Sequence, residues 1–231
     1  MGTVLAGTAL GTLIGDRLPQ RIRETVFHSL GLVTILIGVD AGLEAFGPTL
    51  AGLTRASLVI VMGSVLIGGV IGELLGIERG LSRLGDALKA RFAQRQAHFT
   101  EGFVVASLVF CVGPLTVLGS IEDGLTGDYR LLAIKSLLDG FAAVAFASAL
   151  GWGVGFSALT VLLYQGALTL SASWAAGVFS EPMVAALTAA GGILIIGIGL
   201  RLLELREVRV ANLLPALVLA PVSIAVVERF A

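Results

Sequence analysis

Residues 99–140 read FTEGFVVASLVFCVGPLTVLGSIEDGLTGDYRLLAIKSLLDG, an apolar run of helix length that is broken in its middle and then leads into charges. The break is at Gly113-Pro114. Proline has no amide hydrogen, so in a helix Pro114 would leave the carbonyl oxygen of Phe110 without its donor. In lipid such a group is tolerated only where protein buries it or where it lines a wet cavity. The stretch therefore predicts an interrupted membrane-spanning helix beside a polar site. A plain proline kink before a solvated loop also fits, since Gly and Pro are common in transmembrane helices.

The composition is that of a polytopic membrane protein. Of the 231 residues, 56% are hydrophobic and only 13% are charged, against about 25% charged in soluble proteins. Mean hydropathy is +0.98. The 31 glycines suit helices that approach one another closely in lipid. The net charge of −1 gives no reason to expect nucleic acid as a partner, and the single cysteine, Cys111, excludes an internal disulfide.

Apolar segments of about 17–25 residues predict an all-α polytopic transmembrane helical bundle of about eight spans, in a single transmembrane domain of residues 1–231. The expected helices are 2–16, 27–46, 57–77, 100–120, 131–150, 154–174, 184–203 and 211–228. The first is short for a full crossing, so the count falls to about seven if that helix does not cross.

Two segments share a pattern that suggests an internal repeat. GTLIGDRL at residues 11–18 aligns with GGVIGELL at 68–75, and Gly7 and Ser64 come one step earlier. This spacing places small residues on one helix face, so we expect both faces at helix-helix contacts. A basic amphipathic stretch follows each copy, which gives repeat units 1–50 and 58–125 of span, interfacial helix and span. Glycine bias alone could also produce the match.

Positive charge is concentrated in three loops. Eleven of the fifteen Lys and Arg residues follow the first, third and seventh predicted helices: Arg17, Arg21, Arg23, Arg79, Arg83, Lys89, Arg91, Arg95, Arg201, Arg206 and Arg209. The positive-inside rule then places these loops in the cytoplasm and both termini outside. The stretch 77–98 would lie on the cytoplasmic leaflet with anionic lipid as its expected partner, as a surface anchor or as a signalling element.

The sequence contains no catalytic motif. His28 and His98 have no metal-ligand spacing to another ligand residue, and there is no HExxH, P-loop or GxSxG motif. We therefore expect no enzyme activity, no catalytic residue, no metal site and no cofactor.

Polar residues inside the predicted spans are the candidate binding residues. An ionisable residue there costs about 2.5–3.5 kcal/mol on insertion scales and needs a partner or a water path. The candidate substrate-binding residues are Ser107, Gly113, Pro114, Thr116, Lys135, Ser136, Asp139 and Gln165. Lys135 and Asp139 are four residues apart, so they can also neutralise each other as a purely structural pair. Gln165 falls in the middle of a span, where its amide either bonds to another helix or faces a solute.

Several uncommon short sequences occur in one order along nearly the whole chain. They are GFVVASLVFCVGPLTVLGSIEDGLTGDYRLLAIKSLLDG, ASALGWGVGFSAL, Gln165-Gly166, GGILIIGIGLRLLEL and NLLPALVLAP. In these segments the chain resembles the YqgA-like bacterial inner-membrane proteins, which form family 554 of the domains of unknown function. The resemblance implies a multi-span helical fold in a bacterial inner membrane. It implies no substrate.

The pattern favours a transporter of a small solute or ion, with a site between the second, fourth, fifth and sixth predicted helices. One alternative is a pore formed by homo-oligomerisation of glycine-rich helices. Another is a non-transporting scaffold or sensor that uses the stretch 77–98. A hydrated cavity that reaches Asp139 and Gln165 would favour transport or a pore, whereas a dry bundle with a closed Lys135–Asp139 pair would favour a scaffold.

Overall fold

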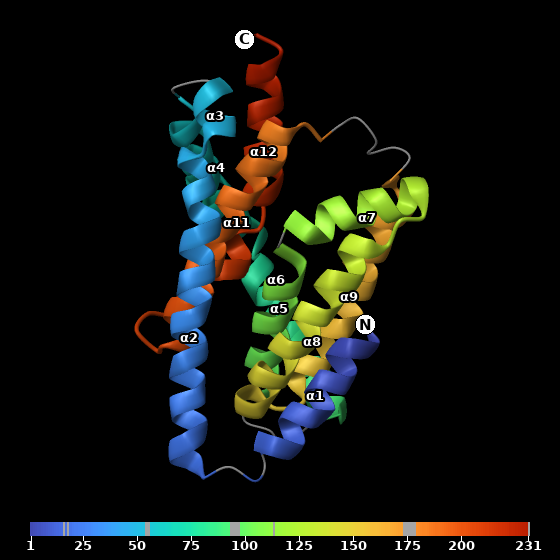
Figure 1. Cartoon of the computed structure of the whole chain (residues 1–231). Helices are drawn as coiled ribbons and strands as arrows, with labels where there is room; N and C mark the ends of the chain where they lie inside the picture. The colour runs from blue at the N-terminus through green and yellow to red at the C-terminus, as the bar shows by residue number, and fades with distance from the viewer. Residues whose placement is uncertain are drawn as a thin grey trace. The chain divides into compact units, whose positions relative to one another are not determined.

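The computed structural model describes residues 1–15, 17, 19–53, 56–92, 98–112, 114–172 and 179–230. In these ranges all regular secondary structure is helical and no strand occurs. The predicted all-α fold is therefore confirmed (Figure 1). The candidate Gly113 and residues 93–97 of the predicted amphipathic stretch lie outside the described residues.

The helices follow one another along the chain with short connections. They are α1 (Gly2–Gly15), α2 (Gln20–Leu43), η1 (Glu44–Phe46), α3 (Pro48–Leu53), α4 (Ser57–Leu75), α5 (Ile77–Phe92), α6 (Phe99–Val112), α7 (Pro114–Thr126), α8 (Arg130–Leu150), α9 (Gly153–Leu170), α11 (Glu181–Leu202), η2 (Val210–Leu213) and α12 (Ala216–Glu228).

Six helical segments are long and apolar enough to cross a membrane: Glu24–Leu53, Ser57–Leu75, Arg130–Leu150, Gly153–Leu170, Glu181–Leu202 and Val210–Glu228. A seventh is the bent pair of Phe99–Val112 and Leu115–Thr126, whose helices meet at 60°. The first helix, α1, has only 14 residues, a length of about 21 Å against a hydrocarbon core of about 30 Å. The structure therefore fits the seven-span form of the predicted bundle, and the protein is a multi-pass membrane protein.

The outer faces of the long helices carry large apolar side chains. Leu36 is 69% exposed, Leu66 71% and Leu74 81%. Such residues in a row are costly in water but suit the acyl chains of a bilayer. These helix faces therefore contact lipid.

The described chain forms two compact units. Unit 1 comprises Met1–Leu30 and Gly80–Ala176, and unit 2 comprises Gly31–Arg79 and Gly177–Ala231. That the whole chain acts as one transmembrane domain stays a prediction.

In unit 1, α1 lies along α8 (Figure 1). A Cβ added at Gly7, Gly11 or Gly15 would collide with the carbonyl oxygen of Gly140, Val144 or Ser148. Each of these pairs is separated by the same interval in sequence, so the two helices run parallel and in register. The predicted small-residue face of α1 is thus confirmed as a helix contact.

In unit 2, the second small-residue face has a different partner. A Cβ at Gly72 would collide with the carbonyl oxygen of Asn212, and one at Gly68 would meet Ala216 of α12. The prediction of a helix contact at this face is confirmed as well. The centre of this unit is α11, most of whose residues are buried and which packs on α12, α3 and α4.

The predicted interfacial helix after the first span is not a separate element. Residues 20–43 form the single helix α2, because no glycine or proline interrupts the chain between Gln20 and Leu30. After α4 the chain does break, at Gly76 with φ 65°, and the amphipathic residues form their own helix, α5. The two proposed repeat units therefore differ at this point, and the rest of the repeat stays a prediction.

Candidate functional site

The interruption in the quoted stretch separates α6 from α7. The carbonyl oxygen of Phe110 accepts a hydrogen bond of 3.1 Å from the hydroxyl of Thr116. Both residues are buried. The carbonyl that Pro114 leaves without an amide donor is therefore satisfied inside the protein, which makes Thr116 a structural partner of the break.

A tight hairpin joins α8 to α9. Gly151 has φ 76°, a backbone conformation that other residues adopt only at a cost, so the chain can reverse over a few residues. Asp139 precedes Leu150 by eleven residues and Gln165 follows Gly153 by twelve. At 1.5 Å per residue they lie about 17 Å and about 18 Å from the hairpin, near the middle of a bilayer core of about 30 Å.

A cavity of about 560 Å³ lies in unit 1 and extends from Asp139 and Gln165 toward the ends of α8 and α9 that are remote from the hairpin. Its walls come mainly from α8 and α9. The lining residues are Met1, Asp123, Tyr129, Leu132, Ala133, Lys135, Ser136, Asp139, Val161, Leu162, Gln165, Gly166, Thr169 and Leu170. The cavity thus joins apolar walls to a few polar groups, as small-molecule sites do.

An ion pair forms part of the wall. Lys135 Nζ donates a hydrogen bond to Asp139 Oδ2. The side chains are only 7% and 14% exposed, so each charge depends on the other for its stability inside the protein. The spacing of four residues along α8 places the two groups on one helix face, as the sequence predicts.

The other polar groups of the cavity differ in how they are satisfied. Ser136 shares a hydrogen bond of 2.8 Å with the Thr3 hydroxyl, which fastens α8 to the start of α1. No described residue forms a hydrogen bond with the Gln165 amide, which is half-buried. Asp123 adds a second carboxylate, and within the described ranges it forms no ion pair. The cavity therefore holds both satisfied and unsatisfied polar groups.

The structure gathers part of the predicted site. Lys135, Ser136, Asp139 and Gln165 line the cavity, whereas Ser107 and Thr116 are not among its lining residues. The Ser107 hydroxyl instead donates to the Thr160 hydroxyl at 3.0 Å, between α6 and α9. The side chain of Pro114, like Gly113, lies outside what the structure describes. The role of these residues in ligand binding stays a prediction.

Three polar lining residues were not predicted: Asp123, Tyr129 and Thr169. Thr169 follows Gln165 by four residues on α9, so helical periodicity alone could have identified it. Asp123 belongs to the charges that follow the broken span, but it lies at the end of α7, beyond the predicted helix. Tyr129 precedes α8, where no sequence signal marks it.

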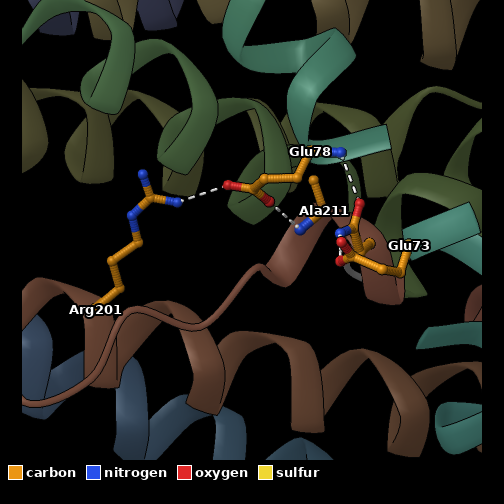
Figure 2. Close-up of polar contacts among 5 residues, drawn as sticks. Glu73, Glu78, Arg201 and Ala211 are labelled. Carbon is orange, nitrogen blue, oxygen red and sulfur yellow. Dashed lines mark hydrogen bonds and ion pairs between the residues drawn. The ribbon is translucent and has the colours of Figure 1, made fainter. Parts of the chain in front are cut away.

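A second polar cluster lies in unit 2 (Figure 2). Glu78 Oε1 accepts from Arg201 at 2.9 Å, and Glu78 Oε2 accepts from the backbone amide of Ala211 at 2.8 Å. Asn212 accepts from the Glu78 amide at 2.7 Å and donates to Glu73 at 2.6 Å. Each oxygen of the Glu78 carboxylate thus accepts a hydrogen bond from a protein group, so this cluster is a clasp between the start of α5, the end of α11 and η2.

Comparison with known proteins identifies relatives that match this chain over nearly their whole length. The chain is 33% identical over 238 residues to the uncharacterized protein YqgA of Escherichia coli (strain K12), with 99% of this chain and 95% of that protein covered. It is 28% identical over 227 residues to the uncharacterized membrane protein YdfK of Bacillus subtilis (strain 168), covering 98% and 94%. No solved structure matches the chain. The model of the family described as "Protein of unknown function (DUF554)" matches residues 1–225, so the chain belongs to this family.

Proposed function

We propose that this protein transports a small solute or ion across a bacterial inner membrane, and that the cavity of unit 1 is the binding site. The observation that carries the proposal is a cavity whose wall contains both the Lys135–Asp139 ion pair and the Gln165 amide, with which no described residue forms a hydrogen bond. Ionisable and polar groups inside membrane-spanning helices are expensive unless they serve a binding site or a polar path. The same features give no support to enzyme activity, and we propose none.

A pore formed by several copies is the weaker alternative. It needs glycine-rich helix faces that are free to meet another copy. The faces of α1 and α4 are occupied within the chain, by α8 and by η2 with α12. This favours a site within one chain, and homo-oligomerisation remains a separate prediction.

The accessibility of position 165 tests the proposal. The native cysteine is first removed with Cys111→Ala, and Gln165→Cys is then introduced. A small, polar thiol reagent added to membrane vesicles should modify position 165. Ala158→Cys is the matched control on the same helix, because Ala158 is 7% exposed and does not line the cavity. If position 165 is as unreactive as position 158, the cavity is dry and the transport proposal fails.

A second proposal concerns α5, which we infer to contact anionic lipid on the cytoplasmic leaflet. Its two carboxylates are engaged by other parts of the chain: Glu78 by Arg201, and Asp86 by the Thr100 hydroxyl at 2.7 Å. The remaining charges are basic, and Arg79, Arg83 and Arg91 are exposed. Leu84 and Phe92 are exposed beside them, at 50% and 60%. A basic helix with exposed apolar side chains suits an anionic membrane surface.

The orientation of the chain belongs to the same proposal. The basic loops around residues 17–23, 79–95 and 201–209 face the cytoplasm. The C-terminus then lies outside, and the N-terminus lies outside as well if α1 crosses as an eighth span. Contacts between the last two loops support a shared face for them whether or not α1 crosses, because Glu78 pairs with Arg201 and Glu73 pairs with Arg209.

A further inference from the structure

We infer that the ligand of the unit 1 cavity is a small zwitterion, with one ammonium and one carboxylate on neighbouring atoms as in an α-amino acid. This inference rests on the proposed function of that cavity. Its basis is the way in which Lys135 and Asp139 are arranged in the cavity wall together with Gln165 and Asp123.

The ion pair selects against ligands of a single charge. Lys135 and Asp139 neutralise each other with little access to water. An anion that pairs with Lys135 would leave the Asp139 carboxylate alone, and a cation that pairs with Asp139 would leave Lys135 alone. An unpaired buried charge is strongly unfavourable. A zwitterion avoids both penalties, because its carboxylate pairs with Lys135 while its ammonium pairs with Asp139.

The geometry suits a ligand whose charges are close together. Lys135 Nζ and Asp139 Oδ2 are in direct contact. A ligand that binds between them after a small side-chain movement must therefore carry its ammonium and its carboxylate close to each other. The lysine side chain has a flexible stem of four carbons, so its ammonium can move to admit the ligand without a shift of α8.

Three further groups favour this class of ligand. The Gln165 amide can both donate and accept hydrogen bonds and has no described partner, so it can bind either end of a zwitterion. Asp123 adds a second carboxylate to the lining, and Met1, whose amino group interacts with Asp139, adds a second cationic group. The lining therefore offers partners for both charges of a zwitterion. The volume of about 560 Å³ falls within the range of about 300–1,000 Å³ that small-molecule sites occupy.

Sets of three related compounds test the inference: an amino acid, the amine that lacks its carboxylate and the acid that lacks its amino group. In the first set L-alanine carries both charges, ethylamine only the positive charge and propionate only the negative charge. L-leucine, isopentylamine and 4-methylpentanoate form a second set. Binding to detergent-purified full-length protein is measured by thermal shift and by calorimetry. We expect the zwitterion of at least one set to bind at least tenfold more tightly than its amine and its acid.

Variants of the pair give a second readout. Lys135→Met with Asp139→Leu replaces both charges by apolar groups and should keep the protein folded while it abolishes zwitterion binding. Glu122→Gln, at a neighbouring carboxylate that is not among the lining residues of the cavity, should leave zwitterion binding within about threefold of the wild type.

Three results overturn the inference. An amine or an acid that binds as tightly as its zwitterion shows a site for a single charge. If a neutral solute binds and no zwitterion does, the proposed transport function stands but the inferred ligand class is wrong. If no compound binds and position 165 is also unreactive toward the thiol reagent, both the ligand class and the transport function fail.

Discussion

The hydroxyl of Thr116 donates a hydrogen bond of 3.1 Å to the carbonyl oxygen of Phe110, across the break between α6 and α7. Phe110 precedes Pro114 by four residues, so its carbonyl is the one that proline deprives of an amide donor. A side chain two residues after the proline supplies the missing donor. The interruption can therefore persist in lipid without water at that carbonyl.

Replacing Thr116 by Val should destabilise the protein by about 1–3 kcal/mol, because the change keeps the shape of the side chain but leaves a buried carbonyl unsatisfied. Thr116→Ser keeps the hydroxyl and serves as the control. Thermal unfolding in detergent measures both. Equal melting temperatures for Thr116→Val and wild type would show that another donor reaches Phe110.

Glycine positions on α4 should respond oppositely to the same substitution. Gly72→Ala drives a Cβ into the carbonyl oxygen of Asn212, an overpacking cost of about 1–3 kcal/mol. Gly63→Ala meets nothing within 4 Å and should be neutral or stabilising by up to about 1 kcal/mol, since alanine favours helix. Gly11→Ala on α1 should behave like Gly72→Ala.

A reversed order of melting temperatures for Gly72→Ala and Gly63→Ala would contradict the packing of α4 on η2. Unchanged oligomeric state in all three variants, measured by size-exclusion chromatography with light scattering, is also expected. A change of oligomeric state in Gly11→Ala or Gly72→Ala would mean that these faces also meet another copy.

The small-residue faces were predictable because helix periodicity is a local property of the sequence. Spacing of three and four residues identified the faces of α1 and α4 as contacts, and the same rule paired Lys135 with Asp139. It could not name the partner helices, since α1 contacts a segment 133 residues away. The boundaries of α2 were missed because an amphipathic pattern does not end a helix without a glycine or proline.

The clasp around Glu78 could not be predicted from the sequence for a related reason. Arg201 lies 123 residues from Glu78, and neither residue belongs to a motif. Asn212 was recognisable as a polar residue at the start of a span, but its two partners, Glu73 and the Glu78 amide, depend on the fold. The same principle applies to the cavity: the sequence named three lining residues of α8 and Gln165 of α9 as candidates, but it could not show that Asp123 of α7 and Tyr129 lie beside them.

Glu78→Gln should lower the free energy of unfolding by about 1.5–3 kcal/mol, because it removes the charge that receives Arg201 and the Ala211 amide. Arg83→Gln, on an exposed position of the same helix, should change it by no more than about 0.5 kcal/mol. Denaturant or thermal unfolding in detergent compares the two. If both variants change the free energy of unfolding equally, the contacts of Glu78 contribute no more to stability than a surface ion pair does.

The orientation can be read from single cysteines in the Cys111→Ala background. An impermeant thiol reagent applied to intact cells should modify a cysteine at position 2 but not one at position 90, because the basic loops are proposed to be cytoplasmic. Modification of both positions after the cells are permeabilised is the control. Labelling at position 90 in intact cells would overturn the orientation, and no labelling at position 2 would indicate that α1 does not cross.

The last prediction separates a binding role of Asp139 from a structural one. Asp139→Asn keeps the shape of the side chain but leaves the Lys135 ammonium, which is 7% exposed, without its counter-charge. If the pair is purely structural, stability should fall by about 3–5 kcal/mol, as for other buried pairs that lose one partner. If the cavity admits water and solute, the ammonium can be hydrated, so the loss of stability should be smaller and ligand binding should fall.

The double variant Lys135→Met with Asp139→Leu completes this comparison, because it removes both charges and leaves none unpaired. We expect its melting temperature to return to within a few degrees of wild type while ligand-induced stabilisation is lost. Recovery of stability together with full ligand binding would show that the pair only holds α8 in place and that the solute binds elsewhere. Failure to recover stability would mean that the introduced methionine and leucine side chains pack poorly in the cavity wall. The test is then repeated with Lys135→Gln and Asp139→Asn, which keep a hydrogen bond between two neutral groups.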